Sequence, residues 1–148
     1  MFHIILFEPE IPPNTGNIIR LSVNIGCELH LIRPLGFSID QKSLQRAGMD
    51  YINEKKINIW DNLDNCLNKI TLSSIYSVST KGQENYSDIN YQSGDVFIFG
   101  PESRGLPKKI RNQYKSIFIP MRSKGRSLNL ANAVSVIIYE AWRQLEFN

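Results

Sequence analysis

The sequence predicts an α/β fold in which a mostly parallel sheet is flanked by helices. Nearly continuous apolar segments of strand length recur along the chain, and the clearest are FHIILF at residues 2–7 and DVFIF at residues 95–99. Such segments are typical of strands that are buried on both faces of a parallel sheet. They alternate with helical patterns, as βαβ units require. The length of 148 residues favours a single domain covering residues 1–148.

The first strand, helix and second strand follow one another closely. After the strand at residues 2–7, proline-rich residues 8–13 predict an extended connector, because proline restricts φ. Asn14 or Thr15 is expected to cap a helix whose apolar residues recur at helical spacing up to Gly26. Residues 28–32, ELHLI, then alternate as a strand does.

The remaining elements continue this alternation. Asp40 is expected to cap a short helix that ends at Gly48, and the polar stretch 79–93 is expected to be a loop. Further strands are predicted at residues 56–60, 74–78 and 116–119, and further helices at residues 61–69, from about residue 108, and at about 128–146.

Three polar loops directly follow predicted strands, at residues 8–17, 100–107 and 120–129. Ligands of open parallel sheets bind at the carboxyl ends of the strands, so we expect these loops to converge on a site. Asn14 lies in the first loop, and Arg20 follows six residues later, near enough to reach a ligand. Alternatively, Asn14 serves only as a helix cap and Arg20 is an ordinary surface residue.

The second loop, GPESRGLP, places Glu102 between glycines that permit close approach of the backbone to a ligand. Glu102 could bind a substrate amine or an arginine, or form a surface ion pair beside Arg104 within a structural turn. The chain has no G-x-G-x-x-G, P-loop, nucleophile elbow or evident carboxylate pair. A site of Arg, Asn, Ser and Glu therefore indicates positioning and electrostatic stabilisation rather than covalent catalysis.

The third loop joins an apolar strand to the last helix, with Ser127, Asn129 and Asn132 at the junction. The N–H groups at the start of a helix favour anions and polar ligands. The net charge is +3, and basic residues cluster near this loop, which indicates a phosphate-binding surface. A solvated helix face and loop would give the same pattern. The cluster comprises Arg104, Lys108, Lys109, Arg111, Lys115, Arg122, Lys124 and Arg126.

The cysteines and histidines predict neither a disulfide nor a metal site. Cys27 and Cys66 lie in apolar surroundings without short spacing, which indicates buried, reduced thiols. His3 and His30 have no Cys, His or carboxylate partner at ligand spacing, so structural histidines are expected. No apolar run reaches membrane length, and the N-terminus becomes acidic too early for a signal peptide, so a cytoplasmic protein is expected.

With these motifs together, the chain resembles the SPOUT superfamily of RNA methyltransferases. More narrowly, it is similar to the TrmL group, the tRNA (cytidine/uridine-34) ribose 2′-O-methyltransferases. The resemblance runs essentially end to end, and only the loop at 122–125 is more basic than the family pattern. It is carried by the segments EPEIPPNTGNIIRL, RAGMDY, TKG, FGPESRGLP, IPM and RSLNLANAVSVIIYEAWRQL.

The resemblance implies a deep trefoil knot at the C-terminal end, although knots are rare among proteins. It also implies that S-adenosyl-L-methionine is the methyl donor. The matching cofactor positions are Val78, Gly100, Ile119 and Ser127. The matching catalytic positions are Arg20, Asn14, Glu102 and Asn129.

The implied reaction is methylation of the ribose 2′-hydroxyl of the wobble nucleotide, C34 or U34, in the anticodon loop of tRNA. Bases in single-stranded loops can be splayed out and reached. A homodimer would assemble the RNA surface, and no metal is needed. Because arginine is effectively always protonated, Arg20 is expected to stabilise alkoxide charge rather than act as a free base. The alternatives are a SPOUT enzyme for another tRNA or rRNA position, and a non-catalytic RNA-binding dimer.

Overall fold

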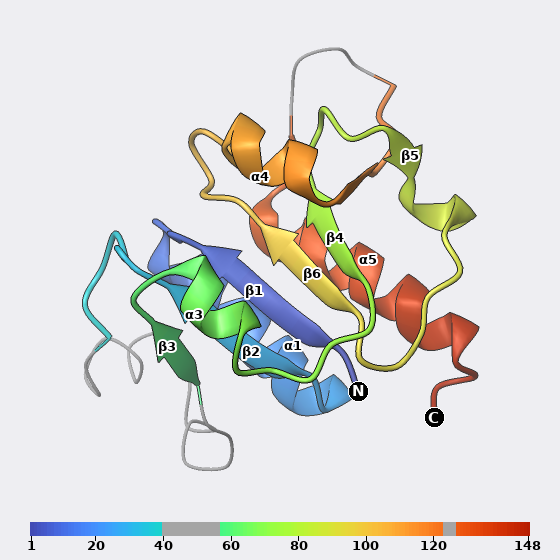
Figure 1. Ribbon diagram of the computed structural model, residues 1–148, viewed down its shortest axis with the longest axis horizontal. Coiled ribbons are helices and arrows are strands. Elements are labelled where there is room, and N and C mark those ends of the chain that lie inside the picture. The colour runs from blue at the N-terminus through green and yellow to red at the C-terminus, as the bar shows by residue number, and fades with distance from the viewer. Residues whose placement is uncertain (40–56, 123–126) are drawn as a thin grey trace.

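The computed structural model describes residues 1–39, 57–122 and 127–148 and shows one sheet between two layers of helices (Figure 1). The helix expected at residues 40–48 lies outside the described residues, as do Lys124 and Arg126 of the basic cluster. The elements in chain order are β1 His3–Phe7, α1 Pro12–Ile25, β2 Glu28–Ile32, β3 Asn58–Trp60, α3 Leu63–Leu67, β4 Ile75–Val78, β5 Glu84–Asn85, the 3-10 helix η1 Tyr86–Asp88, β6 Val96–Phe99, α4 Lys108–Gln113, β7 Lys115–Phe118 and α5 Leu130–Gln144.

The sheet has seven strands in the order β3-β2-β1-β6-β4-β7-β5, and every pairing between the described strands is parallel. This confirms the predicted α/β fold with a parallel sheet. The strands therefore all end at the same edge, towards which the arrowheads of β1 and β6 point in Figure 1. The three polar loops leave the sheet at that edge.

Helices cover both faces of the sheet. α1 packs against α5 behind the sheet, and α3 and α4 lie in front of it (Figure 1). Ile18 and Ile137 are fully buried in the rear core, and Ile5 and Ile98 in the front core. Burying each of these side chains stabilises the fold by about 1.5–3 kcal/mol relative to leaving it exposed. Within the described ranges, none of the helices has the length and apolar character that crossing a bilayer requires.

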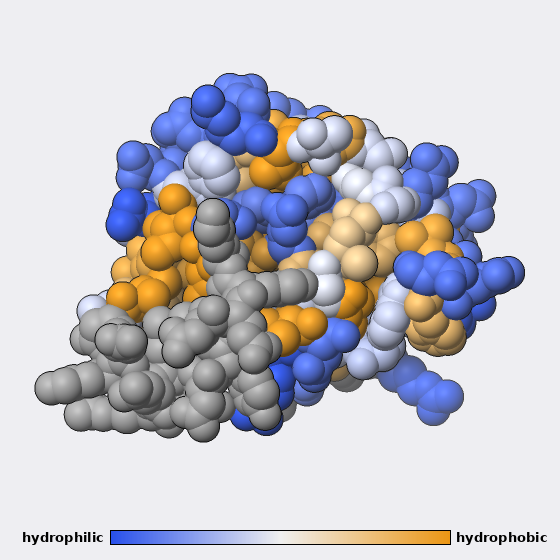
Figure 2. Space-filling view, turned by 90° about the horizontal axis from the view of Figure 1, so that it is seen from below, coloured by the Kyte–Doolittle hydropathy of each residue, from blue (hydrophilic) through white to orange (hydrophobic). Residues whose placement is uncertain are grey.

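The outer surface is mixed in character. In Figure 2, outside the part drawn in grey, apolar residues form separate patches that hydrophilic residues interrupt. Scattered apolar residues of this kind are normal on the surface of a folded protein.

The start of α1 differs from the prediction that Asn14 or Thr15 caps it. The helix begins at Pro12, with Ile11 as its N-cap and no side-chain cap hydrogen bond. Prolines suit the first helical positions, because the N–H that they lack has no partner there. The prediction of the cap was therefore wrong, and the side chain of Asn14 is available for contacts with other loops. The end of the helix at Gly26, with φ 79°, is as predicted.

The stretch 79–93 was predicted to be a loop but contains β5 and η1. β5 has two residues and pairs with β7, which is too short a strand to give a periodic signal. Gly82 lies against β7 so closely that a Cβ there would come within 2.4 Å of the carbonyl group of Ile117. The segment from β4 to β5 is therefore held tightly across β7.

Both cysteines are buried, as predicted. Burial raises the pKa of the Cys66 thiol to about 12. At pH 8 its thiolate fraction should be about 10³-fold below that of an exposed cysteine. We expect Cys66, measured in a Cys27→Ser variant, to react with a thiol reagent at pH 8 far more slowly in the native protein than in urea. Similar rates in the two conditions would show that the site opens freely.

The two histidines are hydrogen-bonded structural residues, as predicted, but the expectation that they lack a ligand-type neighbour was wrong. His3 Nδ1 lies 3.1 Å from His30 Nε2, and the Glu28 carboxylate lies 3.7 Å from both nitrogens. His3 pairs with Glu28 in the register of β1 and β2. Glu28 and His30 are two residues apart and share one face of the sheet. Strand pairing thus joins residues that are distant in sequence.

Candidate active site

A cavity of about 940 Å³ opens at the carboxyl edge of the sheet, a volume typical of small-molecule sites. All three polar loops contribute to it, which confirms that they converge. Its lining includes every predicted cofactor position and three of the four predicted catalytic positions. These are Val78, Gly100, Ile119 and Ser127, together with Asn14, Glu102 and Asn129.

A chain of hydrogen bonds connects the three loops across this cavity. Asn14 Nδ2 donates to Glu102 Oε1 at 3.2 Å, and Asn129 Nδ2 donates to Asn14 Oδ1 at 2.8 Å. A carboxylate only accepts hydrogen bonds, so the orientation of the Asn14 amide is determined by Glu102, and that of Asn129 by Asn14. Polar networks in which every member is satisfied rigidify a site. The three side chains therefore form one rigid unit.

Asn129 also begins the last helix. Its Oδ1 accepts hydrogen bonds from the backbone N–H groups of Ala131 at 2.9 Å and Asn132 at 3.3 Å, so Asn129 is the N-cap of α5. The positive end of the α5 dipole is thereby directed to the cavity. The predicted loop-to-helix junction is confirmed at this position.

Glu102 has a different set of partners from those expected. Its carboxylate accepts hydrogen bonds from the backbone N–H groups of Glu10 at 2.8 Å and Ile11 at 3.1 Å, as well as from Asn14. It thus satisfies donors just ahead of α1, where no side chain caps the helix. Arg104 pairs with Glu8 instead. The interpretation of Glu102 and Arg104 as a surface ion pair was therefore wrong.

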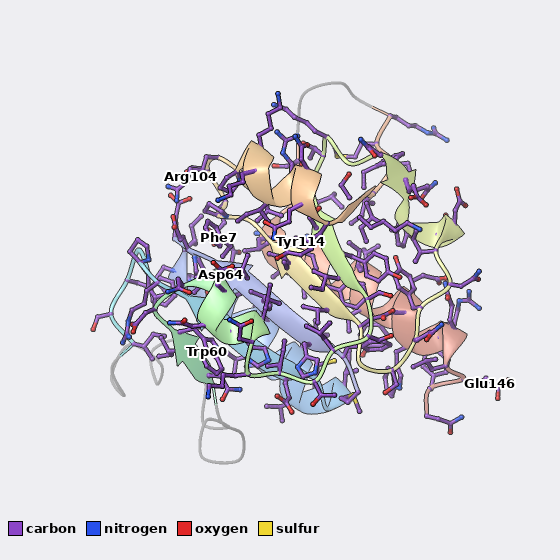
Figure 3. All side chains as sticks on the ribbon, viewed as in Figure 1. Phe7, Trp60, Asp64, Arg104, Tyr114 and Glu146 are labelled. Carbon is purple, nitrogen blue, oxygen red and sulfur yellow. The ribbon has the colours of Figure 1, made fainter. Side chains whose placement is uncertain are left out.

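Glu10 makes a second contact between the first loop and the second loop. Its carboxylate accepts hydrogen bonds from Ser103 Oγ at 2.8 Å and from the Ser103 backbone N–H at 3.1 Å. The bond from the Ser103 side chain is the main cause that lowers the pKa of Glu10. Arg104, labelled in Figure 3, lies beside these loops. Sequence reasoning missed Glu10 and Ser103, whose only signal was that both lie in loops expected to converge.

Gly100 allows the second loop to fold back on itself. A Cβ at this position would lie 2.3 Å from the backbone nitrogen of Leu106 and 2.4 Å from the carbonyl carbon of Gly105. Both atoms belong to the backbone, so they cannot move aside as a flexible side chain would. Gly100 thereby shapes the wall of the cavity that the loop forms.

We expect Gly100→Ala to lower the free energy of unfolding in urea by about 3 kcal/mol or more, because the added methyl overpacks a rigid backbone contact. Gly105→Ala is the matched control. Gly105 has φ 67° but open space around its Cβ position, so its replacement should cost only about 1 kcal/mol. Equal costs for the two variants would contradict the close contact at Gly100.

Basic side chains lie along part of the cavity. Arg104 and Arg111 of the predicted cluster line it, and so does Lys81, which lies in the TKG segment and outside that cluster. Lys108, Lys109 and Arg122 are exposed outside it. The cavity and its surroundings are thus suited to an anionic partner such as a phosphate backbone.

Arg20 is the predicted site residue that the cavity does not include. It lies on α1, exposed, and is not among the lining residues in the described part of the chain. Six residues of helix place it about 9 Å along the axis and about 240° round it from Asn14. Within one chain, the structure therefore does not bring Arg20 together with the other predicted site residues.

Comparison with known proteins agrees with this geometry. A family model described as the SpoU rRNA Methylase family matches residues 1–139. The tRNA (cytidine(34)-2′-O)-methyltransferase of Methylovorus glucosotrophus is 49% identical over a match that covers 99% of this chain and 97% of the relative.

Solved structures are similar over nearly the whole chain. One, described as giving structural insights into the 2-OH methylation of C/U34 on tRNA, has a TM-score of 0.93 at 40% identity and covers 100% of this chain and 98% of that chain. The AdoMet-bound rRNA methyltransferase from Sinorhizobium meliloti has a TM-score of 0.84 at 25% identity and covers 97% of this chain and 56% of that chain. The fold, the cavity and these matches together show that the chain belongs to the SpoU methylase family.

Proposed function

We propose that this protein transfers a methyl group from S-adenosyl-L-methionine to the ribose 2′-hydroxyl of the wobble nucleotide, C34 or U34, of tRNA. The observation that carries the proposal is the cavity in which Asn14, Glu102 and Asn129 form one hydrogen-bonded unit. Relatives that share almost the full length of the chain are named for this reaction. We take residues 1–148 to act as one methyltransferase domain, in the cytoplasm where tRNA is modified.

The lining of the cavity fits S-adenosyl-L-methionine. Val78, Ile119 and Leu128 offer apolar contacts, and Ser127 and Asn129 offer polar groups. This mixture suits a ligand with an adenine ring, a ribose and a charged amino-acid tail. The bound cofactor supplies a methyl group that its sulfonium centre already activates. The protein then has to orient the ribose and stabilise charge, and the proposed step needs no metal.

Arg20 is the residue that we assign to charge stabilisation. A guanidinium is protonated at any working pH, so it is a poor general base but a strong partner for an alkoxide or a phosphate. As the 2′-hydroxyl gives its proton to solvent water, Arg20 would stabilise the negative charge that develops on the oxygen. Ser127 and Asn129 would hold the reactants in line, which is the other large source of rate enhancement in a site without a nucleophile.

A homodimer would bring Arg20 to a cavity. Arg20 is exposed on α1 and absent from the lining of its own cavity among the described residues. α1 packs against α5, which exposes Val136 and Tyr139 three residues apart on one side, and Ile11 is exposed ahead of α1. Apolar side chains that are exposed on packed helices suit a subunit interface, and arginine is enriched at such interfaces. We propose that Arg20 of one protomer completes the cavity of its partner.

The trefoil knot is also part of the proposal. β7 lies between β4 and β5 in the sheet, although both of these strands precede it in the chain. The segment that connects them is held across β7, where Ser79 N donates to Ile117 O and Gln83 N donates to Ser116 O. The chain that follows β7 has to pass this segment to reach α5. This arrangement supports a threaded C-terminal end.

The experiment that tests the function is transfer of a labelled methyl group to unmodified tRNA, followed by mapping of the methylated nucleotide by mass spectrometry. We expect label on the ribose of nucleotide 34, as the names of the relatives indicate. Label at another position would assign the protein to a different substrate. Binding of tRNA without any transfer would favour the non-catalytic RNA-binding dimer.

A further inference from the structure

The chain carries a second cluster of functional groups at the other end of the sheet. His3, Glu28 and His30 lie at or near the amino ends of β1 and β2, whereas the cavity lies at the carboxyl ends of the strands. β1 has five residues, so about 16 Å of strand separates the two ends. One ligand atom from each of the three residues lies within 4.8 Å of the others.

The spacing of these atoms matches a zinc site. The distance from His3 Nδ1 to His30 Nε2 is 3.1 Å, and Glu28 Oε2 lies 3.7 Å from each nitrogen. The point in the plane of these three atoms that is equidistant from them lies about 2.0 Å from each, so a shift of the exposed Glu28 carboxylate by roughly 0.4 Å would bring all three atoms to the bond length of Zn²⁺ in a tetrahedral site. We propose that His3, His30 and Glu28 bind a zinc ion.

Two properties of the cluster support this assignment. Its strands hold the ligands in place, since His3 pairs in register with Glu28 and both histidines are buried. The Glu28 side chain is 60% exposed, so the ion can enter from solvent and a water molecule can complete a tetrahedral shell.

Hydrogen bonds occupy the same nitrogens in the structure. The indole N–H of Trp60 donates to His30 Nδ1 at 3.1 Å. An indole only donates, so the proton of the neutral His30 ring lies on Nε2, which donates to His3 Nδ1. His3 Nε2 then donates to the carbonyl oxygen of Thr71 at 3.2 Å. Every ring nitrogen has a partner in this arrangement.

Zinc binding would replace the hydrogen bond between His30 Nε2 and His3 Nδ1, and it would also break the bond from Trp60 to His30. Coordination leaves the bond from His3 Nε2 to Thr71 in place, because the metal takes the other nitrogen. His30 has to move its proton from Nε2 to Nδ1, which can then no longer accept from Trp60. Trp60 is only half-buried, on the edge strand β3 (Figure 3), so its indole N–H can turn to water. The Trp60–His30 bond therefore competes with the metal.

The test is a zinc titration of the full-length, untagged protein by calorimetry at pH 7.5, together with thermal melting. We expect one zinc ion per chain and a melting temperature that rises with zinc concentration, because the ion binds the folded state. His3→Asn should weaken binding by about 100-fold or more, because loss of an outer-shell partner alone costs about 10–100-fold and His3 would be a direct ligand. Glu28→Gln, an exposed position where folding is not at risk, should also weaken it.

The Trp60→Phe variant tests whether the Trp60–His30 hydrogen bond competes with zinc. Removing the competing donor should tighten zinc binding by about tenfold, the equilibrium effect of about one hydrogen bond. Glu84→Gln is the matched control, because Glu84 is an exposed carboxylate that pairs with Lys115 far from the cluster in the sheet order, and its variant should bind zinc as the parent does. No saturable zinc binding, or binding that survives both His3→Asn and Glu28→Gln, would overturn the proposed site.

Discussion

Replacement of Arg20 by alanine is expected to lower the rate of methyl transfer by about 10²–10³-fold, the usual cost of removing one donor that stabilises developing charge. The loss should appear in kcat, while binding of S-adenosyl-L-methionine stays close to that of the parent, since Arg20 does not line the cavity of its own chain among the described residues. Arg20→Lys should recover part of the rate, because it keeps the charge but not the planar fork. Single-turnover transfer to tRNA measures the effect.

Arg33→Ala is a suitable control for this variant. Arg33 is also exposed and pairs with Asp61 at 3.1 Å, on the β2–β3 side of the sheet. Its removal should leave the rate of methyl transfer nearly unchanged. Full activity of Arg20→Ala would show that the assignment of Arg20 is wrong.

Mixed dimers separate action within one chain from action across the interface. Arg20→Ala chains are expected to transfer methyl at a small fraction of the parental rate, and so are Asn14→Asp chains when S-adenosyl-L-methionine is kept too dilute to fill their weakened cavity. Refolded together in equal amounts, they would restore about a quarter of the sites if Arg20 serves the cavity of its partner, because half of the dimers are mixed and each has one complete site. An inactive mixture would mean that Arg20 acts within its own chain.

At position 14, replacement of asparagine by aspartate is expected to be more damaging than replacement by alanine. The substitution is nearly isosteric, but it replaces the amide that donates to Glu102 at 3.2 Å by a carboxylate. Two carboxylates would then face each other, and the free energy of unfolding should fall by about 1–3 kcal/mol at pH 7.5. Binding of S-adenosyl-L-methionine should weaken by about tenfold or more. Urea unfolding and calorimetry measure the two effects.

Two further variants, Asn14→Ala and Asn132→Asp, serve as comparisons for Asn14→Asp. Asn14→Ala removes both hydrogen bonds without adding charge, so we expect it to be less harmful than Asn14→Asp. Asn132→Asp makes the same chemical change at an exposed position in the first turn of α5, where the helix dipole favours an acid, and should be tolerated. An Asn14→Asp protein as stable as the Asn132→Asp protein would contradict the role of the hydrogen-bonded chain.

Much of the fold followed from local patterns. The apolar segments at residues 2–7 and 95–99 became β1 and β6, because a strand buried on both faces has to be apolar along its whole length. The end of the first helix at Gly26 was also predicted from the sequence. The strand β5 was not, since two residues that pair only through their backbone leave no periodic signal.

The candidate site was predictable as a set of loops but not as a network. The prediction that the loops meet at one edge follows from the parallel sheet, and the cavity at that edge confirms it. The role of Glu102 was not predictable, because its partners are the backbone N–H groups of Glu10 and Ile11, whose positions depend on where α1 begins. The contact between His3 and His30 likewise depends on strand register, which short sequence spacing cannot show.

The measurement that tests the central claim most directly uses a tRNA whose nucleotide 34 carries a 2′-deoxyribose. The proposal requires the 2′-oxygen of that nucleotide to accept the methyl group, so transfer of label from S-adenosyl-L-methionine should fall to background. The same tRNA with an ordinary ribose at nucleotide 34 should accept about one methyl group per molecule. Undiminished transfer to the deoxy-substituted tRNA would contradict the proposed reaction, because the methyl group would then have another acceptor.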